Sequence, residues 1–367
     1  MPEIPFGDLA REYQEIRHKI DPAVARVLSR GWFVLGPEVD AFEQAFAQYL
    51  GSEYCVGVAS GTEALALALM ASDVGPGDEV ITVSHTAVPT ATAISMTGAT
   101  PVFVDICSDT YLMDVSRVEA ALTPRTRAIV PVHLYGQCVE MTPLLTLANR
   151  HDLPVIEDCA QAHGAADHSR KAGTMGAMGC FSFYPSKNLG AYGDGGAVVT
   201  SDAGLAEQLR MLRNYGQRRR YEHTIKGLNS RLDDVQAAIL STKLAFLDDW
   251  NERRRRIASL YRESLKDLPV RAPAERPDCH HVYHLFVLQT DQRDDLQAFL
   301  AEQGIRTLIH YPIPIHLQQA YQDLGHTKGR FPVTEQAVER IVSLPLYPQL
   351  RDDEVAYVID SIRRFFT

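Results

Sequence analysis

Lys187 stands in surroundings that favour covalent chemistry. It follows Phe181, Phe183 and Tyr184 within a short segment, residues 181–188. Partial burial among such neighbours disfavours the charged ammonium and lowers the pKa of a lysine, so that its free amine can attack a carbonyl and form a Schiff base. The same amine could then carry a proton between two carbon atoms. The alternative is a lysine whose charged end simply reaches the protein surface, and this segment alone does not exclude it.

A candidate phosphate site lies far upstream, at Ser60-Gly61-Thr62-Glu63. A serine followed three residues later by a glutamate fits a capping box, which predicts that a helix begins here. The free N–H groups and the positive end of a helix start attract anions, and Gly61 allows close approach. The hydroxyl groups of Ser60 and Thr62 add donors, and Ser182, in the lysine-bearing segment, could donate a further hydrogen bond. An ordinary capped helix without a ligand is the alternative.

An acidic and an amide side chain follow a predicted strand over residues 154–158. Asp158 ends this strand, and Gln161 lies three residues later. Ligands of open α/β sheets bind at the carboxyl ends of strands, so a carboxylate at this point could contact a cofactor. A loop or cap role for Asp158 is equally compatible with its position. The glycine-rich residues 190–196 match neither a dinucleotide-binding motif nor a P-loop, and we interpret them as a tight turn that passes close to a bound ring.

The elements that must position these residues indicate an α/β fold with a mostly parallel central sheet. Apolar, β-branched runs predict strands, and helical patterns follow several of them. Continuous apolar strands that alternate with helices are typical of a sheet covered by helices on both faces. The predicted strands are 54–59, 79–83, 101–105, 128–133, 154–158 and 282–288, and the predicted helices are 62–70, 90–96, 141–150 and one or two long helices from 232.

A second, smaller α+β domain is predicted toward the C-terminus. The long helical pattern ends before a proline-rich stretch at 269–277, and shorter elements follow it. We therefore divide the chain into a large domain, residues 1–250, and a small domain, residues 251–367. Either part could hold residues 1–20.

The composition of the 367 residues is typical of an acidic globular protein. With 36 basic and 46 acidic residues, the formal net charge is −10, which disfavours binding to nucleic acid or to an anionic membrane. We recognise no secretory signal and no transmembrane run, and the six cysteines form no Cys-x-x-Cys pair. We therefore expect a cytoplasmic protein with buried free thiols and with neither a structural metal nor disulfides.

The order of these motifs resembles the DegT/StrS family of nucleotide-sugar aminotransferases, and the likeness spans almost the whole chain. The segments that carry it are 31–38, 60–62, 157–161, 181–189, 227–231, 310–312 and 343–348. The resemblance implies the fold-type I aminotransferase architecture, a homodimer with shared active sites, and pyridoxal 5′-phosphate (PLP) as cofactor. It also implies transfer of an amino group, usually from L-glutamate, to a keto group of a nucleotide-linked sugar.

The resemblance also implies roles for residues at matching positions. Lys187 is implied to form the Schiff base with PLP, Asp158 to pair with the pyridine nitrogen, and Gln161 to lie against the ring. Asn229 looks like the residue that reaches the phosphate of the neighbouring subunit, although a plain turn before a helix is the alternative. The residues implied to hold the phosphate are Gly61, Thr62 and Ser182, and Ser60 joins them as a candidate through its place at the helix start.

The sequence departs from the family at the position of an aromatic side chain that often stacks on the cofactor ring. Here the pair is Thr86-Ala87, and His85 precedes it. Stacking by an aromatic side chain at position 87 is therefore lost. His85 is a candidate cofactor contact in its place, and aliphatic contacts with the ring are the alternative.

Within the family, residues 132–137, 184–190 and 214–216 look most like those of enzymes that aminate C3 of a 3-keto-6-deoxyhexose on thymidine diphosphate. Tyr184, His310 and Tyr311 are candidates for the sugar pocket, or are simply packed side chains. Enzymes that act at C4 or on UDP- or GDP-sugars, and a PLP-binding relative with a regulatory or non-catalytic role, are the alternatives. Related sugar dehydratases carry histidine in place of the lysine, so Lys187 argues against that activity.

Overall fold

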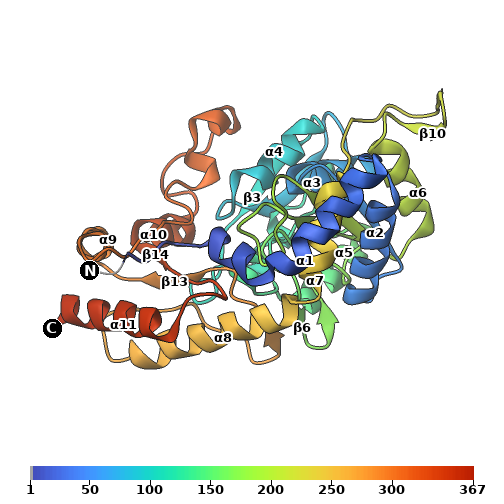
Figure 1. The fold of residues 1–367 in the computed structure, drawn as a ribbon. Helices are drawn as coiled ribbons and strands as arrows, with labels where there is room; N and C mark the ends of the chain where they lie inside the picture. The colour runs from blue at the N-terminus through green and yellow to red at the C-terminus, as the bar shows by residue number, and fades with distance from the viewer. Residues whose placement is uncertain (1–2) are drawn as a thin grey trace.

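The computed structural model describes residues 3–367 (Figure 1). Its helices are α1 (Leu9–Arg30), α2 (Pro37–Leu50), α3 (Gly61–Ala71), α4 (Val88–Met96), α5 (Met141–Arg150), α6 (Ala203–Leu212), α7 (Asp234–Leu244), α8 (Leu247–Ser264), α9 (Arg293–Glu302), α10 (Pro332–Arg340) and α11 (Asp352–Phe366). Its strands are β1 (Tyr54–Val58), β2 (Glu79–Val83), β3 (Thr100–Val104), β4 (Thr126–Ile129), β5 (Ile156–Asp158), β6 (Ala166–Asp167), β7 (Arg170–Lys171), β8 (Met178–Ser182), β9 (Gly196–Thr200), β10 (Gln217–Arg219), β11 (Glu222–His223), β12 (Cys279–His280), β13 (Phe286–Gln289) and β14 (Ile341–Leu344). None of these helices is both long and apolar enough to cross a membrane.

The central sheet has the strand order β3-β2-β4-β5-β8-β9-β1. Two hydrogen-bonded groups of strands meet through parallel bridges from Ile129 to Val155 and from Val132 to Asp158. Every neighbouring pair is parallel except those of β9, which runs antiparallel to both β8 and β1. The prediction of a mostly parallel central sheet flanked by helices is therefore confirmed.

Alternate side chains of the strands enter two separate cores, one on each face of the sheet. On β8, Cys180 packs with α3, α4 and α6, whereas Phe181 packs with α2, α5 and α7. The same alternation places Val198 and Val199 of β9 in different cores. Because successive strand residues point to opposite faces, burial of both faces requires the continuous apolar strands that the sequence contains.

A third core lies in the C-terminal part of the chain. It joins Ile4 with α8 from Ile257 onward, with α9 and α11, and with the antiparallel pair β13–β14. In Figure 1, these orange and red elements lie beside the body that carries the sheet. Ile4 also bridges to Ile305, whereas Ile16 and Ile20 of α1 pack against α7. Both α8 and the N-terminal residues thus contribute to more than one core, and the division at residue 250 stays a prediction.

Two strands, β4 and β13, differ most from the predicted bounds. β4 ends at Ile129, because Pro131 has no N–H to donate and Tyr135 soon turns the chain into the left-handed region at φ 60°. The last predicted strand begins later, as β13, because the Val282 N–H donates instead to the Gly136 carbonyl (3.0 Å). Both changes bring chain segments together beside the end of β5.

Candidate active site

Lys187 lies in the turn that follows β8, where the chain reverses toward β9. Its backbone N–H donates to the Tyr184 carbonyl (2.9 Å), and the Ala191 N–H donates to the Phe183 carbonyl (2.8 Å), so the turn is anchored to the end of the strand. The side chain is partly exposed. Burial of the amine lowers the pKa of Lys187 to about 8, an effect that the charge of Asp158 opposes. An uncharged amine is therefore available near neutral pH.

Asp158 ends β5 with a carboxylate that is 5% exposed. Thr90 Oγ1 donates to its Oδ2 (2.8 Å), and the Ala160 N–H donates to its Oδ1 (3.1 Å). Burial raises the pKa of Asp158, against the opposing effect of these hydrogen bonds and of Lys187. The carboxylate forms no ion pair with any residue between 3 and 367. Because a buried unpaired carboxylate is costly, a cationic group of a ligand fits as its partner.

The start of α3 lies against the end of β8 and forms the candidate anion site. Ser60 caps the helix through its Oγ, which accepts from the Glu63 N–H (3.2 Å). A Cβ atom at Gly61 would lie 2.5 Å from Ser182 Cβ, so only glycine lets the two segments approach this closely. The structure thus brings Ser60, Gly61 and Ser182 together, with Thr62 in the adjoining helical turn. The first N–H groups of a helix have no partner within it, so a phosphate can accept hydrogen bonds here.

Gln161 connects the sheet to the loop that carries His310 and Tyr311. Its Nε2 donates to the Tyr311 hydroxyl (3.0 Å), and its Oε1 accepts from the Tyr135 N–H (2.6 Å). Nδ1 of His310 lies 2.8 Å from Ser343 Oγ. Burial, and to a smaller extent the charge of Lys187, lower the pKa of His310 to about 4, so its imidazole is neutral. Two of the candidate sugar-pocket residues therefore lie next to a candidate cofactor residue.

His85 is buried in the loop between β2 and α4. Its Nε2 lies 2.9 Å from the Tyr135 hydroxyl, whereas its Nδ1 has no hydrogen-bond partner among residues 3–367. Burial lowers the pKa of His85 to about 4, so this imidazole is neutral as well. Ala87 is the N-cap residue of α4 and is partly exposed. An unpartnered buried nitrogen at this place is available to a ligand.

Two candidate residues have side chains that form no hydrogen bond with the others within one subunit. The side chain of Tyr184 is 57% exposed. Asn229 is exposed too and pairs with Asn214 in an isolated antiparallel bridge. Neither side chain forms a hydrogen bond within residues 3–367. Ser230, next to Asn229, does reach the start of α3, where its Oγ donates to Glu63 Oε2 (2.7 Å).

Three residues at the site were not predicted from the sequence: Thr90, Tyr135 and His163. His163 is fully buried against Phe181, with ring centroids 5.4 Å apart, and neither of its ring nitrogens has a partner within residues 3–367. Burial, reinforced by Lys187, lowers the pKa of His163 to about 3. Thr90 and Tyr135 lie in patterns that indicate only secondary structure, so the fold alone reveals their contacts. The position of His163, two residues after Gln161, was the one available signal.

His133, Glu157 and Cys159 form a buried group that could surround a metal ion. The carboxylate of Glu157, however, accepts from His133 Nε2 (2.8 Å) and from three backbone N–H groups between residues 173 and 176. Nδ1 of His133 accepts from the Val139 N–H (3.1 Å). These bonds occupy the polar atoms of both residues and hold the strand end that carries the neighbouring Asp158, so we assign the group a structural role.

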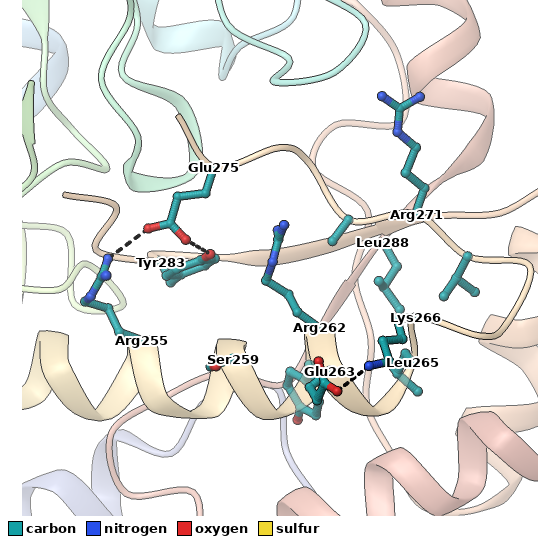
Figure 2. Close-up of a pocket in the computed structure, with 13 residues that line it drawn as sticks. Arg255, Ser259, Arg262, Glu263, Leu265, Lys266, Arg271, Glu275, Tyr283 and Leu288 are labelled. Carbon is teal, nitrogen blue, oxygen red and sulfur yellow. Dashed lines mark hydrogen bonds and ion pairs between the residues drawn. The ribbon is translucent and has the colours of Figure 1, made fainter. Parts of the chain in front are cut away.

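A separate pocket of about 560 Å³ lies between α8 and the chain that precedes β13 (Figure 2). Its charged side chains pair largely with one another: Arg255 with Glu275 (3.1 Å), and Lys266 with Glu263. The Tyr283 hydroxyl also donates to Glu275 (2.8 Å). None of the predicted site residues lines this pocket. This pocket is therefore separate from the predicted site residues at the ends of β5 and β8.

Comparison with known proteins identifies the class. Residues 14–363 match the model of the DegT/DnrJ/EryC1/StrS aminotransferase family, and the chain belongs to this family of PLP-dependent aminotransferases. The predictions of the family, of the fold and of an aminotransferase are confirmed.

Individual relatives are similar over their whole length. The dTDP-3-amino-3,4,6-trideoxy-alpha-D-glucose transaminase of Streptomyces venezuelae is 49% identical over 99% of this chain and 96% of its own. The dTDP-3-amino-3,6-dideoxy-alpha-D-galactopyranose transaminase of Aneurinibacillus thermoaerophilus is 49% identical over 99% of both chains. The crystal structure of S. venezuelae DesV in complex with a ketimine intermediate superposes with a TM-score of 0.98 at 49% identity and covers 100% of this chain and 99% of that one.

Proposed function

We propose that this aminotransferase uses PLP to move an amino group from L-glutamate to C3 of a 3-keto-6-deoxyhexose on thymidine diphosphate. The observation that carries the reaction type is the nearness of two groups: Lys187, an amine with a pKa of about 8, and Asp158, a buried carboxylate whose charge influences that pKa. The choice of C3 and of thymidine diphosphate rests on the full-length likeness to the two transaminases.

The residues present fit PLP. Lys187 offers an amine to its carbonyl carbon, Asp158 offers a carboxylate to its protonated pyridine nitrogen, and the start of α3 with Ser182 offers an anion site to its phosphate. Gln161 and His85 are further candidates for contacts with the ring, and the unpartnered Nδ1 of His85 can accept a hydrogen bond. When bound, PLP supplies an electron sink for the carbon that loses a proton.

Lys187 is also the residue that we expect to move the proton. Its free amine can take a proton from the carbon of the amino donor and later return one to the acceptor carbon. A pKa of about 8 suits both steps, because a base and its conjugate acid are both useful only when the pKa lies near the working pH. Asp158 lies close enough to influence this pKa, since its charge opposes the effect of burial.

Capture of PLP by the protein without cofactor should accelerate as the pH rises through about 8. Only the uncharged amine attacks the carbonyl. Because the pKa is lowered, the fraction of uncharged amine already increases as the pH rises above 7. At pH 7 about a tenth of an amine with a pKa of 8 is uncharged, compared with less than about a thousandth of an ordinary lysine. The rate at which visible absorption develops after PLP addition, between pH 6 and 10, measures this titration. A midpoint near that of an exposed lysine contradicts the assignment.

We further propose a homodimer with shared active sites. Large apolar side chains that a second subunit would cover are exposed at Phe33, Tyr184, Tyr215 and Tyr221. Tyr221 is 81% exposed at the turn of the hairpin β10–β11, which extends away from the body in Figure 1. Asn229 follows this hairpin along the chain, so contact with a neighbouring subunit would give its exposed side chain a phosphate to bind. The proposal includes a cytoplasmic enzyme without nucleic-acid or membrane partners.

The substrate proposal is tested with a panel of keto sugars, PLP and L-glutamate. We expect amination of the 3-keto-6-deoxyhexose on thymidine diphosphate, with kcat/KM at least about tenfold higher than for its 4-keto isomer or a UDP-linked analogue. Mass spectrometry detects the product, and NMR locates the new amine. A preference for C4 or for another nucleotide replaces the substrate assignment. Failure with every keto sugar favours the alternative, a PLP-binding protein with a regulatory or non-catalytic role.

A further inference from the structure

We infer that Tyr135 is a positioning residue that holds the candidate sugar pocket against the candidate cofactor site. This inference rests on the proposed function, which supplies the keto sugar and L-glutamate as the two substrates. Tyr135 is 2% exposed, and its backbone lies in the left-handed region at φ 60° and ψ 1°. Residues other than glycine rarely adopt this conformation, and it persists where the surrounding structure enforces it.

Both the backbone N–H and the hydroxyl of Tyr135 form hydrogen bonds with candidate site residues. Its N–H donates to Gln161 Oε1 (2.6 Å), its hydroxyl donates to the His310 carbonyl, and His85 Nε2 lies 2.9 Å from the same hydroxyl. A hydroxyl has one proton, and here His310 receives it, so Nε2 of His85 must donate to the hydroxyl oxygen. Three residues that the sequence singled out separately therefore meet at one residue that it did not.

The segment around Tyr135 is fixed between two distant parts of the chain. On one side, the His133 N–H donates to the Asp158 carbonyl (3.0 Å). On the other side, the Gly136 carbonyl accepts from the Val282 N–H (3.0 Å), and a Cβ atom on Gly136 would lie 2.9 Å from Val282 Cγ2. The left-handed turn thus connects the end of β5 to the chain that precedes β13.

Loss of the hydroxyl would act first on the loop that carries His310 and Tyr311. It would leave His85 Nε2 without a partner in a buried place and the His310 carbonyl without one in a partly buried place, which costs more than the loss of one solvated hydrogen bond. The hydroxyl forms no hydrogen bond with Lys187 or Asp158. The keto-sugar half of the reaction should therefore suffer more than the L-glutamate half.

The test compares Tyr135→Phe with Tyr111→Phe in the full-length holoenzyme. For Tyr135→Phe we expect KM for the keto sugar to rise by about tenfold. The rate at which L-glutamate removes the visible absorption should change by less than about threefold. Tyr111 is a matched control, because it is equally buried, its hydroxyl donates to Gln289 Oε1 (2.7 Å), and its ring centroid lies 6.5 Å from that of Tyr135. Tyr111→Phe should change neither the KM for the keto sugar nor the rate with L-glutamate. If both variants are active and have the same KM for the keto sugar, the inference is overturned.

A double-mutant cycle with Tyr311→Phe separates positioning from general damage to the fold. If Tyr135 acts through the loop, the increase in KM for the double variant will be smaller than the product of the two single increases, whereas independent effects multiply. A crystal structure of Tyr135→Phe gives a readout that needs no activity. A displaced Tyr311 supports the inference, and an unmoved Tyr311 that still accepts from Gln161 overturns it. A wild-type enzyme that aminates no keto sugar instead defeats the proposed function.

Discussion

Replacement of Lys187 by alanine should abolish amination while the protein stays folded. The variant loses both the nucleophile and the group that carries the proton, so we expect the rate of product formation to fall by about 10³-fold or more. The fold should tolerate the change, because the side chain forms no ion pair within residues 3–367 and backbone hydrogen bonds hold its turn. Mass spectrometry of the product measures the activity, and circular dichroism with a thermal scan measures the fold.

Two further variants control for charge and for lysine loss in general. Lys187→Arg keeps a positive charge, but a guanidinium supplies no free amine near neutral pH, so this variant should be as inactive as Lys187→Ala. Lys266 is exposed, pairs with Glu263 and lies in the pocket of Figure 2, away from the site. Lys266→Ala should keep full activity. Equal activities of Lys187→Ala and Lys266→Ala would remove Lys187 from the mechanism.

Asp158→Asn should bind PLP more weakly and aminate the sugar about 10²-fold more slowly, or slower still. Asparagine preserves the size of the side chain, but it lacks the negative charge that stabilises a protonated pyridine nitrogen. Within residues 3–367 no charged group pairs with this carboxylate. Removal of its charge should therefore weaken mainly its interaction with the cofactor. Titration of the protein with PLP gives the Kd, and kcat at saturating PLP separates binding from turnover.

Thr90→Val provides a graded comparison for Asp158→Asn. Thr90 Oγ1 donates to Asp158 Oδ2 (2.8 Å), and valine removes this hydrogen bond at nearly constant volume. The carboxylate keeps its charge in this variant, so we expect a smaller loss of kcat, about tenfold. If Asp158→Asn keeps the wild-type rate and PLP affinity, Asp158 has no part in the mechanism.

Five of the seven strands of the central sheet, β1 to β5, were predictable from the sequence because both faces of the sheet are buried. The residues of β2, for example, are all buried, and its apolar residues enter both cores: Val80 lies in one, and Ile81 and Val83 lie in the other. The strand predicted over residues 154–158 placed Asp158 at the edge of the sheet, whereas β8, which ends at Ser182, was not predicted as a strand. The start of α3 could also be located, since the capping pair Ser60 and Glu63 marks it.

The contacts that complete the site could not be predicted, because they join segments far apart in the sequence. Tyr135 lies among apolar residues, and its left-handed turn is supported by contacts with Val282 and His310, more than 140 residues away. Thr90 has the pattern of an ordinary helix residue, and its bond to Asp158 depends on how α4 packs. Asn229 was placed by resemblance alone, and a single subunit offers its side chain no partner within residues 3–367.

The absorption spectrum of the purified holoenzyme, before and after L-glutamate is added, tests the central claim most directly. We predict a visible band from PLP linked to Lys187, which L-glutamate removes and the keto sugar restores. Borohydride reduction before glutamate addition should leave the cofactor covalently attached to Lys187, as peptide mass spectrometry can show. A protein that takes up no PLP, or whose visible band is unchanged by L-glutamate, would contradict the account.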